Sequence, residues 1–579
     1  MAKAWRTYQS GDGKLLGFDN GRLKMYLDFS SATLPAAGAP DGRGGPAAAG
    51  AAAAVELTSR LLAAARDTEA GKIVNPDENR MAGHYWLRAP ALAPTPEIRD
   101  AIMDALAEIK DGAAKIHSGQ WANPAGGKFR YLVVIGIGGS QLGFQLAAKA
   151  LTDQEAPLIP GFLDNTDPES VYRLTEAIGA DHWAEVLFVV ASKSGGTAEI
   201  SNCYKLLEQI YEDAGLSFGR QALAVTVAGS PLERYAQEHQ WLATFPVWEW
   251  VGGRFSLLSP VGLLPLTLLG ADIESLLAGA GAMDELTRRE AVRENPALAL
   301  THYLLEQTQK RQKKNMVILP YKDRLELWGK YLQQLVMESL GKQTAGPAGI
   351  ARHGITVLGN KGSTDQHSYA QQLLEGNDDF FAILFDFLLD DVPGQPAIAD
   401  GGITMGDYLS AFCHGTLNAM RQKGREALLI TLNRLDPYAL GGLIALFERI
   451  VGFYAAALGI NPYHQPGVEA GKKSAGEILR LKREVSQWLA EPAAGAPGAS
   501  GGSAGGGGSG SGGSGGADGS GASGSGSGGS DSGKTVAALK SRFSQKDYRT
   551  LFYLLLPMRE NAGKSFPLSE ADILTLLEG

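Results

Sequence analysis

The sequence predicts an α/β protein with two doubly wound domains built on parallel sheets. A helical N-terminal segment and a small helical C-terminal module are expected to accompany them. Short apolar runs rich in β-branched residues alternate with longer helical patterns, first from residue 131 and again from residue 315. Strands that are apolar on both faces are typical of parallel sheets covered by helices on both sides. A long Gly/Ser/Ala stretch then separates this body from a short amphipathic tail.

The expected elements follow from hydrophobic periodicity and from turn residues between the periodic segments. The first hundred residues are predicted to be largely helical, with helices at 51–70 and 95–110 and a loop at 35–50. In the first sheet domain we expect strands at 131–137, 158–163, 186–191 and 222–227, and helices at 141–151, 168–178, 197–214 and 231–240. In the second we expect strands at 315–319, 354–358, 380–387 and 427–432, and helices at 323–340, 368–374, 405–423, 436–458 and 468–489. The tail is expected to form helices at 535–544, 545–555 and 569–577.

These patterns divide the chain into five regions. They are a helical N-terminal segment (1–128), a first α/β domain (129–300), a second α/β domain with C-terminal helices (301–493), a Gly/Ser-rich linker (494–533) and a tail module (534–579). The linker composition cannot bury apolar surface and is that of a flexible coil.

Composition excludes several classes of function. The 579 residues carry a formal net charge of −9, which argues against a dedicated nucleic-acid binder. Two cysteines, Cys203 and Cys413, cannot form a disulfide framework and indicate a reducing compartment. No signal-type segment and no apolar run long enough to span a bilayer is present, so a cytoplasmic protein without membrane contact is expected. No zinc-type Cys/His spacing occurs, and neither a metal nor a cofactor is expected.

Two strand–loop–helix segments indicate an anion site. The loop Gly136–Ser140 has neither the dinucleotide-binding glycine spacing nor the P-loop lysine, so a plain tight turn is a real alternative. The second loop places Ser192, Ser194, Thr197 and Lys193 before a helix N-terminus. Ordinary N-capping explains one hydroxyl but not three with paired glycines, so the second loop predicts phosphate binding.

Four later segments carry candidate catalytic groups. Arg254 follows two glycines and suits an oxyanion. Glu338 lies among apolar residues of a helix that also carries Gln334, where it can exchange a proton. His367 follows a Gly-rich turn, and Lys472 lies at helical spacing from small residues after Gln465. Taken singly, each has an ordinary surface or structural alternative.

Together, in this order, these segments resemble glucose-6-phosphate isomerase (phosphoglucose isomerase), a family with two sugar-isomerase (SIS-type) domains. The resemblance covers about 75–489 and is carried by Gly-Gly-Arg-Phe-Ser, Gln-Gln-x-x-Met-Glu-Ser-x-Gly-Lys, Gln-His and Asn-Pro-Tyr-x-Gln-x-Gly-Val-Glu-x-Gly-Lys. The sequence differs from the better-known form at Ser194-Gly-Gly, where a Thr-Phe-Thr run is common.

The resemblance implies a role for each motif residue. Glu338 would move a proton between C1 and C2 through a cis-enediol, with Arg254 stabilising the charge. His367 and Lys472 would assist ring opening, and Glu199 would orient the histidine. The residues implied to bind the sugar phosphate are Gly139, Ser140, Ser192, Lys193, Ser194, Thr197, Gln334 and Gln465. His367 would come from a partner subunit, so a homodimer is implied.

The implied reaction is the reversible isomerisation of glucose 6-phosphate and fructose 6-phosphate in glycolysis and gluconeogenesis. A related isomerase that also takes mannose 6-phosphate is the first alternative. A sugar-phosphate-binding regulator without catalysis is the second, although it would not need Glu338, Arg254, His367 and Lys472 together. A third is a scaffold that docks an unknown partner through the tail.

Overall fold

The computed structural model describes residues 4–30, 46–153, 155–346, 349–390, 392, 394–491, 534–562 and 565–577. The chain divides into two compact units, Met1–His464 and Gln465–Gly579. The predicted linker lies outside the described residues, as does most of the predicted loop at 35–50. The end of that loop, from Pro46, is instead the beginning of a helix.

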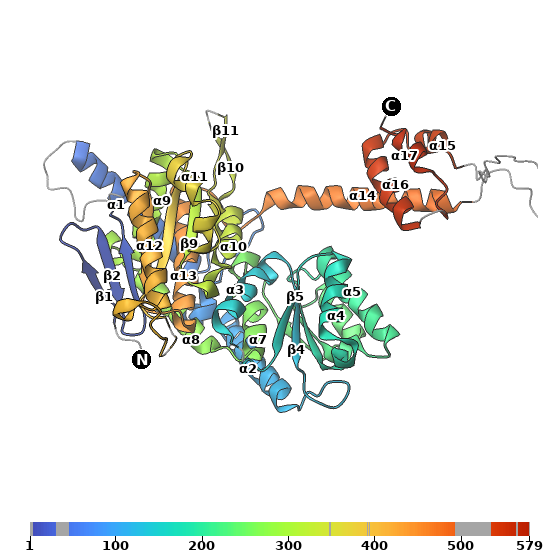
Figure 1. Ribbon diagram of the computed structural model, residues 1–579, viewed down its shortest axis with the longest axis horizontal. Coiled ribbons are helices and arrows are strands. Elements are labelled where there is room, and N and C mark those ends of the chain that lie inside the picture. The colour runs from blue at the N-terminus through green and yellow to red at the C-terminus, as the bar shows by residue number, and fades with distance from the viewer. Residues whose placement is uncertain are drawn as a thin grey trace, which may run out of the picture. The chain divides into compact units, whose positions relative to one another are not determined.

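The first sheet of the larger unit is fully parallel, with strand order β5-β4-β6-β7-β8 (Figure 1). Its strands are β4 (Tyr131–Ile135), β5 (Ile159–Leu163), β6 (Val186–Ala191), β7 (Ala222–Thr226) and β8 (Ala243–Pro246). The connecting helices are α3 (Leu142–Leu151), α4 (Pro168–Ile178), α5 (Ala198–Asp213) and α6 (Pro231–Glu238). Every residue of β6 is buried, as expected for a central strand covered on both faces. Only β8, which is short and ends at a proline, was not predicted.

The second sheet is mixed, with order β1-β2-β3-β14-β13-β9-β12. The predicted strands appear as β9 (Asn315–Pro320), β12 (Thr356–Leu358), β13 (Phe380–Phe387) and β14 (Ala427–Leu432), all parallel to their neighbours within this group. Strand β3 (Lys24–Asp28) pairs antiparallel with β14 and extends the sheet through β2 (Leu15–Asp19) and β1 (Arg6–Gln9).

The expectation of a largely helical N-terminus is therefore wrong for residues 6–28. Glycine-containing turns at Gly11–Gly13 and at Asn20-Gly21 separate three short strands there, and an Asn-Gly pair is a strong hairpin signal. Phe18 and Leu27 are buried within this sheet, which β3 joins by pairing with β14, a strand far away in the sequence.

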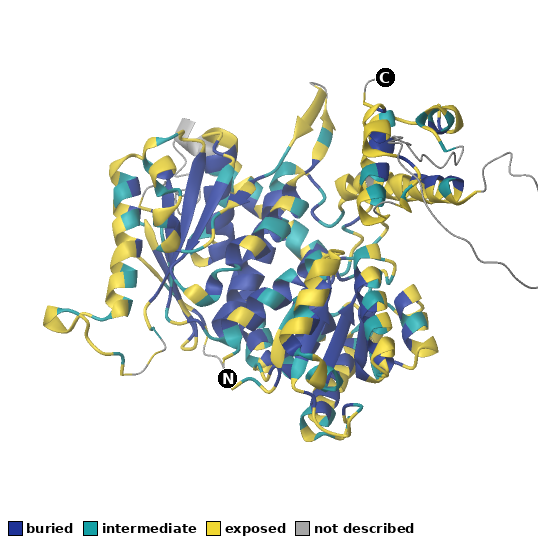
Figure 2. Ribbon diagram, turned by 45° about the vertical axis from the view of Figure 1, so that its right-hand side comes forward, coloured by how far each residue is buried: buried dark blue, intermediate teal, exposed yellow. Residues whose placement is uncertain are grey.

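The remaining helices of this unit are α1 (Pro46–Glu69), α2 (Pro96–Ser118), α7 (Pro260–Leu268), α8 (Ile273–Thr287), α9 (Pro296–Leu305), α10 (Trp328–Leu332), α11 (Ala370–Glu375), α12 (Met405–Gln422) and α13 (Pro437–Leu458). A hairpin, β10 (Gln343–Gly346) and β11 (Gly349–Arg352), follows α10. The buried elements occupy the middle of this unit in Figure 2. Of the described helices, α13 alone is long and apolar enough to cross a membrane, and 89% of its apolar stretch is buried.

The helix predicted at 323–340 is interrupted. A 3-10 turn at Asp323–Leu325 precedes α10, and α10 continues into a π-helical segment, Gln333–Glu338. Single π turns inside α-helices are frequent at functional sites. This one carries both Gln334 and Glu338.

The smaller unit is helical, with α14 (Pro466–Ala490), α15 (Val536–Arg542), α16 (Tyr548–Ala562) and α17 (Glu570–Leu574). Leu481, Val485 and Trp488 recur at helical spacing on α14 and are buried with apolar residues of the tail, including Leu551 and Ile573. The tail thus shares a core with the end of α14, which the sequence had assigned to the second α/β domain.

Candidate active site

The loop between β6 and α5 gathers the predicted hydroxyls. Ser192 Oγ donates a hydrogen bond to Thr197 Oγ1 at 3.2 Å, and Ser194 Oγ lies 3.5 Å from the same atom. Thr197 is the N-cap of α5, but its side chain accepts no hydrogen bond from the helix. The N-terminal N–H groups of α5 therefore lie beside three hydroxyls, an arrangement that favours a phosphate.

A neighbouring strand end fixes the shape of this loop. Thr226 Oγ1 donates to the Ser192 carbonyl oxygen at 2.7 Å and contacts Ser230 Oγ at 2.8 Å. Gly195 adopts φ +65°, and a Cβ there would lie 2.6 Å from the backbone nitrogen of Leu232. Only glycine fits such a turn without strain.

The first glycine loop is the meeting point of two other segments. A Cβ on Gly139 would lie 2.2 Å from the carbonyl carbon of Gly253, so the two backbones touch. Ser256 Oγ donates to the Gly139 carbonyl oxygen at 3.0 Å. A Cβ on Gly138 would lie 3.0 Å from Gln334 Nε2. Gly136–Ser140 thus packs between the arginine segment and the helix of Glu338.

Arg254 and Glu338 form an ion pair beside this meeting point. Arg254 Nη1 lies 3.3 Å from Glu338 Oε2, and the side chains are 4% and 31% exposed. Burial lowers the pKa of Arg254, and the charge of Glu338 opposes that shift. An arginine nonetheless stays protonated in proteins. A cation next to a partly exposed carboxylate suits a reaction in which the carboxylate takes a proton and negative charge develops on the substrate.

The segment around His84 packs against Phe255, the neighbour of Arg254 in the chain. The His84 ring stacks on Phe255, with ring centroids 4.5 Å apart. Burial lowers the pKa of His84 well below its ordinary value, with the charges of Arg88 and Arg449 adding to the effect. His84 is thus a neutral packing residue. Arg254 Nη2 also donates to the His464 carbonyl oxygen at 3.3 Å.

A buried ion cluster anchors this supporting segment to the core. Arg88 makes two hydrogen bonds to Asp284, at 2.6 and 3.1 Å, and also pairs with Glu448 on α13. Burial raises the pKa of Glu448 to about 7, although Arg88 opposes the shift. The cluster explains why charged residues lie in the apolar helix α13.

The other predicted residues belong to separate elements. His367 is exposed at the end of a 3-10 turn, Thr364–His367. The preceding Gln366 donates to Tyr321 Oη at 3.0 Å and to the Phe412 carbonyl oxygen at 3.2 Å, which fixes the turn on α12. Glu199 is half-buried in the first turn of α5. Gln465 and Lys472 belong to the smaller unit, where Gln465 is the N-cap of α14 and Lys472 is exposed on that helix.

Lys342 was not predicted from the sequence. It is buried, and its Nζ donates to the carbonyl oxygens of Glu338 and Ser339. Burial lowers the pKa of Lys342 to about 8, with the charge of Arg254 adding to the effect. Its position four residues after Glu338, at the end of a helix, was the available signal, since lysines often cap the last carbonyls of helices.

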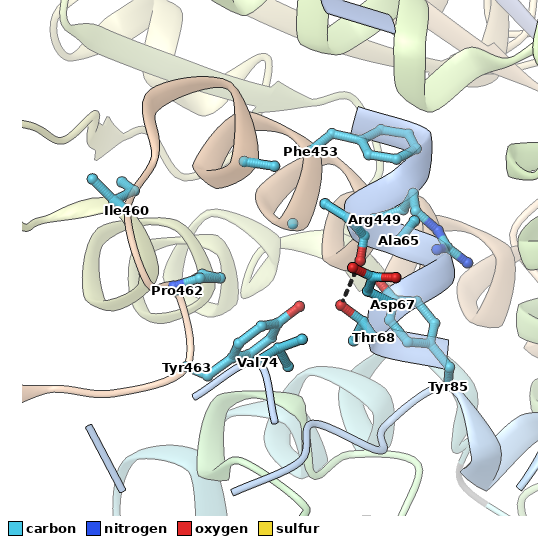
Figure 3. A pocket seen from close by; sticks show the side chains of 13 residues that line it. Ala65, Asp67, Thr68, Val74, Tyr85, Arg449, Phe453, Ile460, Pro462 and Tyr463 are labelled. Carbon is cyan, nitrogen blue, oxygen red and sulfur yellow. Dashed lines mark hydrogen bonds between the residues drawn. The ribbon is translucent and has the colours of Figure 1, made fainter. Parts of the chain in front are cut away.

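A cavity of about 240 Å³ lies elsewhere in the larger unit, between α1, α13 and residues 460–463 (Figure 3). Most of its lining is apolar, and none of the predicted site residues takes part.

Comparison with known proteins agrees with this geometry. The family model for phosphoglucose isomerase matches residues 54–389 and 417–491. Glucose-6-phosphate isomerase of Synechococcus elongatus is 51% identical over 432 residues, which cover 74% of this chain and 81% of that protein. The enzyme of Geobacter sulfurreducens is 50% identical over 430 residues, with 74% and 81% covered. The crystal structure of a glucose-6-phosphate isomerase from Chlamydia trachomatis matches with a TM-score of 0.69 at 25% identity, covering 79% of this chain and 89% of that one.

These relatives place the chain in the class of sugar-phosphate isomerases. Within this class, the chain belongs to the phosphoglucose isomerase family. The predicted fold class is confirmed at the same time.

Proposed function

We propose that the chain interconverts glucose 6-phosphate and fructose 6-phosphate, with Glu338 as the base. The observation that carries the proposal is the Arg254–Glu338 pair, 3.3 Å apart, beside the meeting of Gly139 with Gly253. Family membership and about 50% identity to glucose-6-phosphate isomerases support the same reaction.

The reaction needs one base, one cation and an anchor for the phosphate. The Glu338 carboxylate takes the proton from C2 of the open-chain aldose and returns it to C1, while the proton of the C2 hydroxyl moves to the C1 oxygen. The negative charge that develops on the oxygens of the enediol is stabilised by Arg254. No net oxidation occurs, because one carbon is reduced as its neighbour is oxidised.

The remaining roles are those that the resemblance implies. Ser140, Ser192, Ser194 and Thr197 hold the phosphate, and Gln334 and Gln465 position the sugar. His367 and Lys472 assist ring opening, and Glu199 orients the histidine.

A homodimer is part of this proposal, with His367 supplied across the interface. Met405, Tyr408 and Phe412 follow one another at i, i+3 and i+7 on α12, and they are 71%, 41% and 47% exposed. This apolar stripe adjoins the turn of His367 through the hydrogen bond from Gln366 to Phe412. A second copy that covers the stripe would bury its apolar area and bring His367 toward a partner's site.

The dimer is tested with Phe412→Asp and with Tyr172→Asp as a matched control on α4, where Tyr172 is 52% exposed. We expect the first variant to sediment as a monomer and to lose turnover, and the second to remain a dimer. A monomeric Phe412→Asp variant with full activity would contradict a role for the partner's histidine.

The activity itself is tested by a coupled assay of fructose 6-phosphate isomerisation on the wild type and on Glu338→Gln. The amide keeps the shape of the side chain but cannot accept the proton, so we expect a loss of about 10²- to 10⁴-fold in kcat. A folded wild type without turnover would refute the proposed function, and a Glu338→Gln variant near the wild-type rate would refute the assigned base.

A further inference from the structure

The ammonium group of Lys193 is directed toward the chain before Arg254. Its Nζ donates to the carbonyl oxygens of Glu249 at 2.8 Å and Val251 at 2.9 Å, and lies 3.6 Å from Glu249 Oε2. An ammonium group has three N–H donors and no acceptor. Two of the three donors are thus used by the carbonyl oxygens of Glu249 and Val251, and the Glu249 carboxylate also pairs with the ammonium group, so that its charge is directed toward segment 249–251.

Neighbouring charges hold Lys193 in place. Arg80 Nη2 lies 2.8 Å from Glu249 Oε2, and Arg80 Nη1 lies 2.9 Å from Glu78 Oε2. The Lys193 side chain is 25% exposed. Burial lowers the pKa of Lys193, and Glu249 opposes the shift. Lys193 is thus part of an ion cluster that includes the N-terminal segment and the chain before Arg254.

The two carbonyl acceptors lie just ahead of the catalytic arginine. Val251 is fully buried and precedes Gly252, Gly253 and Arg254 in the chain. Gly253 in turn touches Gly139 of the first loop. A shift of residues 249–251 would therefore move both Arg254 and the surface against which the first loop packs.

We propose that Lys193 is a positioning residue that fixes segment 249–251 and thereby Arg254, and that it does not bind the substrate phosphate. The proposal rests on the proposed function and reassigns one residue of that site. In this arrangement the loop hydroxyls and the N–H groups of α5 hold the phosphate. Lys193 instead connects the loop, through segment 249–251, to Arg254, which stabilises the enediolate.

Kinetics of Lys193→Met separate positioning from phosphate binding. We expect kcat to fall about 10- to 100-fold, as misplacement by an ångström can cost that much. KM for fructose 6-phosphate should stay within about threefold, and the inhibition constant of inorganic phosphate within about twofold. A tenfold rise in that inhibition constant with kcat retained would show that Lys193 binds phosphate and would overturn the proposal. Lys205→Met on α5, which removes an exposed lysine, is the matched control and should behave as wild type.

A double variant tests whether Lys193 acts through Arg254. Adding Lys193→Met to Arg254→Met should slow turnover by less than about twofold further, since the residue being positioned is already gone. Losses that multiply would overturn the proposal. Lys193→Gln, whose amide still donates to a carbonyl, replaces the methionine variant if the latter does not fold.

Direct binding distinguishes failure of this inference from failure of the proposed function. An inactive folded wild type refutes the function alone. Calorimetric titration with inorganic phosphate still tests Lys193: equal affinity of wild type and Lys193→Met supports positioning, and tenfold weaker binding by the variant overturns it.

Discussion

The β6–α5 loop and the Arg254–Glu338 pair differ in how the chain builds them. The loop is made by consecutive residues, 192–197, braced by Thr226 and Ser230 on the next strand end. The pair depends on five segments that are far apart in the sequence: 75–88, 136–140, 252–256, 333–342 and 461–464. The three loop hydroxyls are thus a local feature of one strand–loop–helix unit, whereas the arginine–carboxylate pair depends on the packing of several segments of the larger unit.

This comparison predicts that substitutions in the β6–α5 loop and around the Arg254–Glu338 pair affect different kinetic constants. Changes to the hydroxyls of the loop should weaken binding and leave the chemical step intact. Changes in the supporting segments should slow the chemical step and leave phosphate binding intact.

Of the changes near the Arg254–Glu338 pair, removal of the Arg254 charge should lower kcat the most. Arg254→Met keeps much of the apolar stem but leaves the enediolate without its charge, and we expect kcat to fall about 10²- to 10³-fold. Inhibition by inorganic phosphate should be unchanged. Arg173→Met, which removes an exposed arginine of α4, serves as the control in the same coupled assay. A rise in KM with an unchanged kcat would mean that Arg254 binds the substrate and its transition state equally well.

A methyl group added at Gly139 should push apart the backbones of Gly139 and Gly253, which are in contact. In Gly139→Ala the new Cβ would overlap the Gly253 carbonyl, so one of the chains must move. Overpacking costs about 1–3 kcal/mol, and we expect a loss of about 10- to 100-fold in kcat. Gly476→Ala on α14, where a Cβ meets nothing within 4 Å, is the control. Equal activity of both variants would show that the Gly139–Gly253 contact does not position the chemistry.

Removing loop hydroxyls should have smaller effects, confined to binding. Ser194→Ala and Thr197→Val each delete one hydrogen-bonding group, worth about 0.5–1.5 kcal/mol, so KM should rise about 2- to 10-fold. Ser201→Ala, whose hydroxyl bonds only the helix backbone at Ala198, provides the control. Steady-state measurements should show kcat within twofold of wild type. A large fall in kcat would mean that the loop also takes part in the chemical step.

The same difference explains what could be predicted from the sequence. Strand β6 and its hydroxyl loop follow from a local pattern, and the prediction of β6 matches its observed bounds. The support of Arg254 by His84 and the role of Lys342 depend on long-range packing that no local pattern encodes. Strands β1–β3 were not predicted, although the Asn20-Gly21 pair between β2 and β3 is a local turn signal. The resemblance to a known family, rather than spacing, brought Arg254, Glu338, His367 and Lys472 together.

Lys342 should have the smallest effect, which is a change in how the free energy of unfolding depends on pH. Burial holds its pKa at about 8 in the folded protein, against about 10.4 in the unfolded chain. Between these values the unfolded chain binds more protons, so the free energy of unfolding should rise with pH as this burial penalty disappears. In Lys342→Met the rise should be shallower across about pH 8–10, measured by urea denaturation. Lys205→Met should keep the wild-type slope, since Lys205 is exposed. Identical slopes in wild type and Lys342→Met would show that Lys342 titrates as an ordinary lysine, and that its bonds to the carbonyls of Glu338 and Ser339 hold the end of the base's helix without a charge penalty.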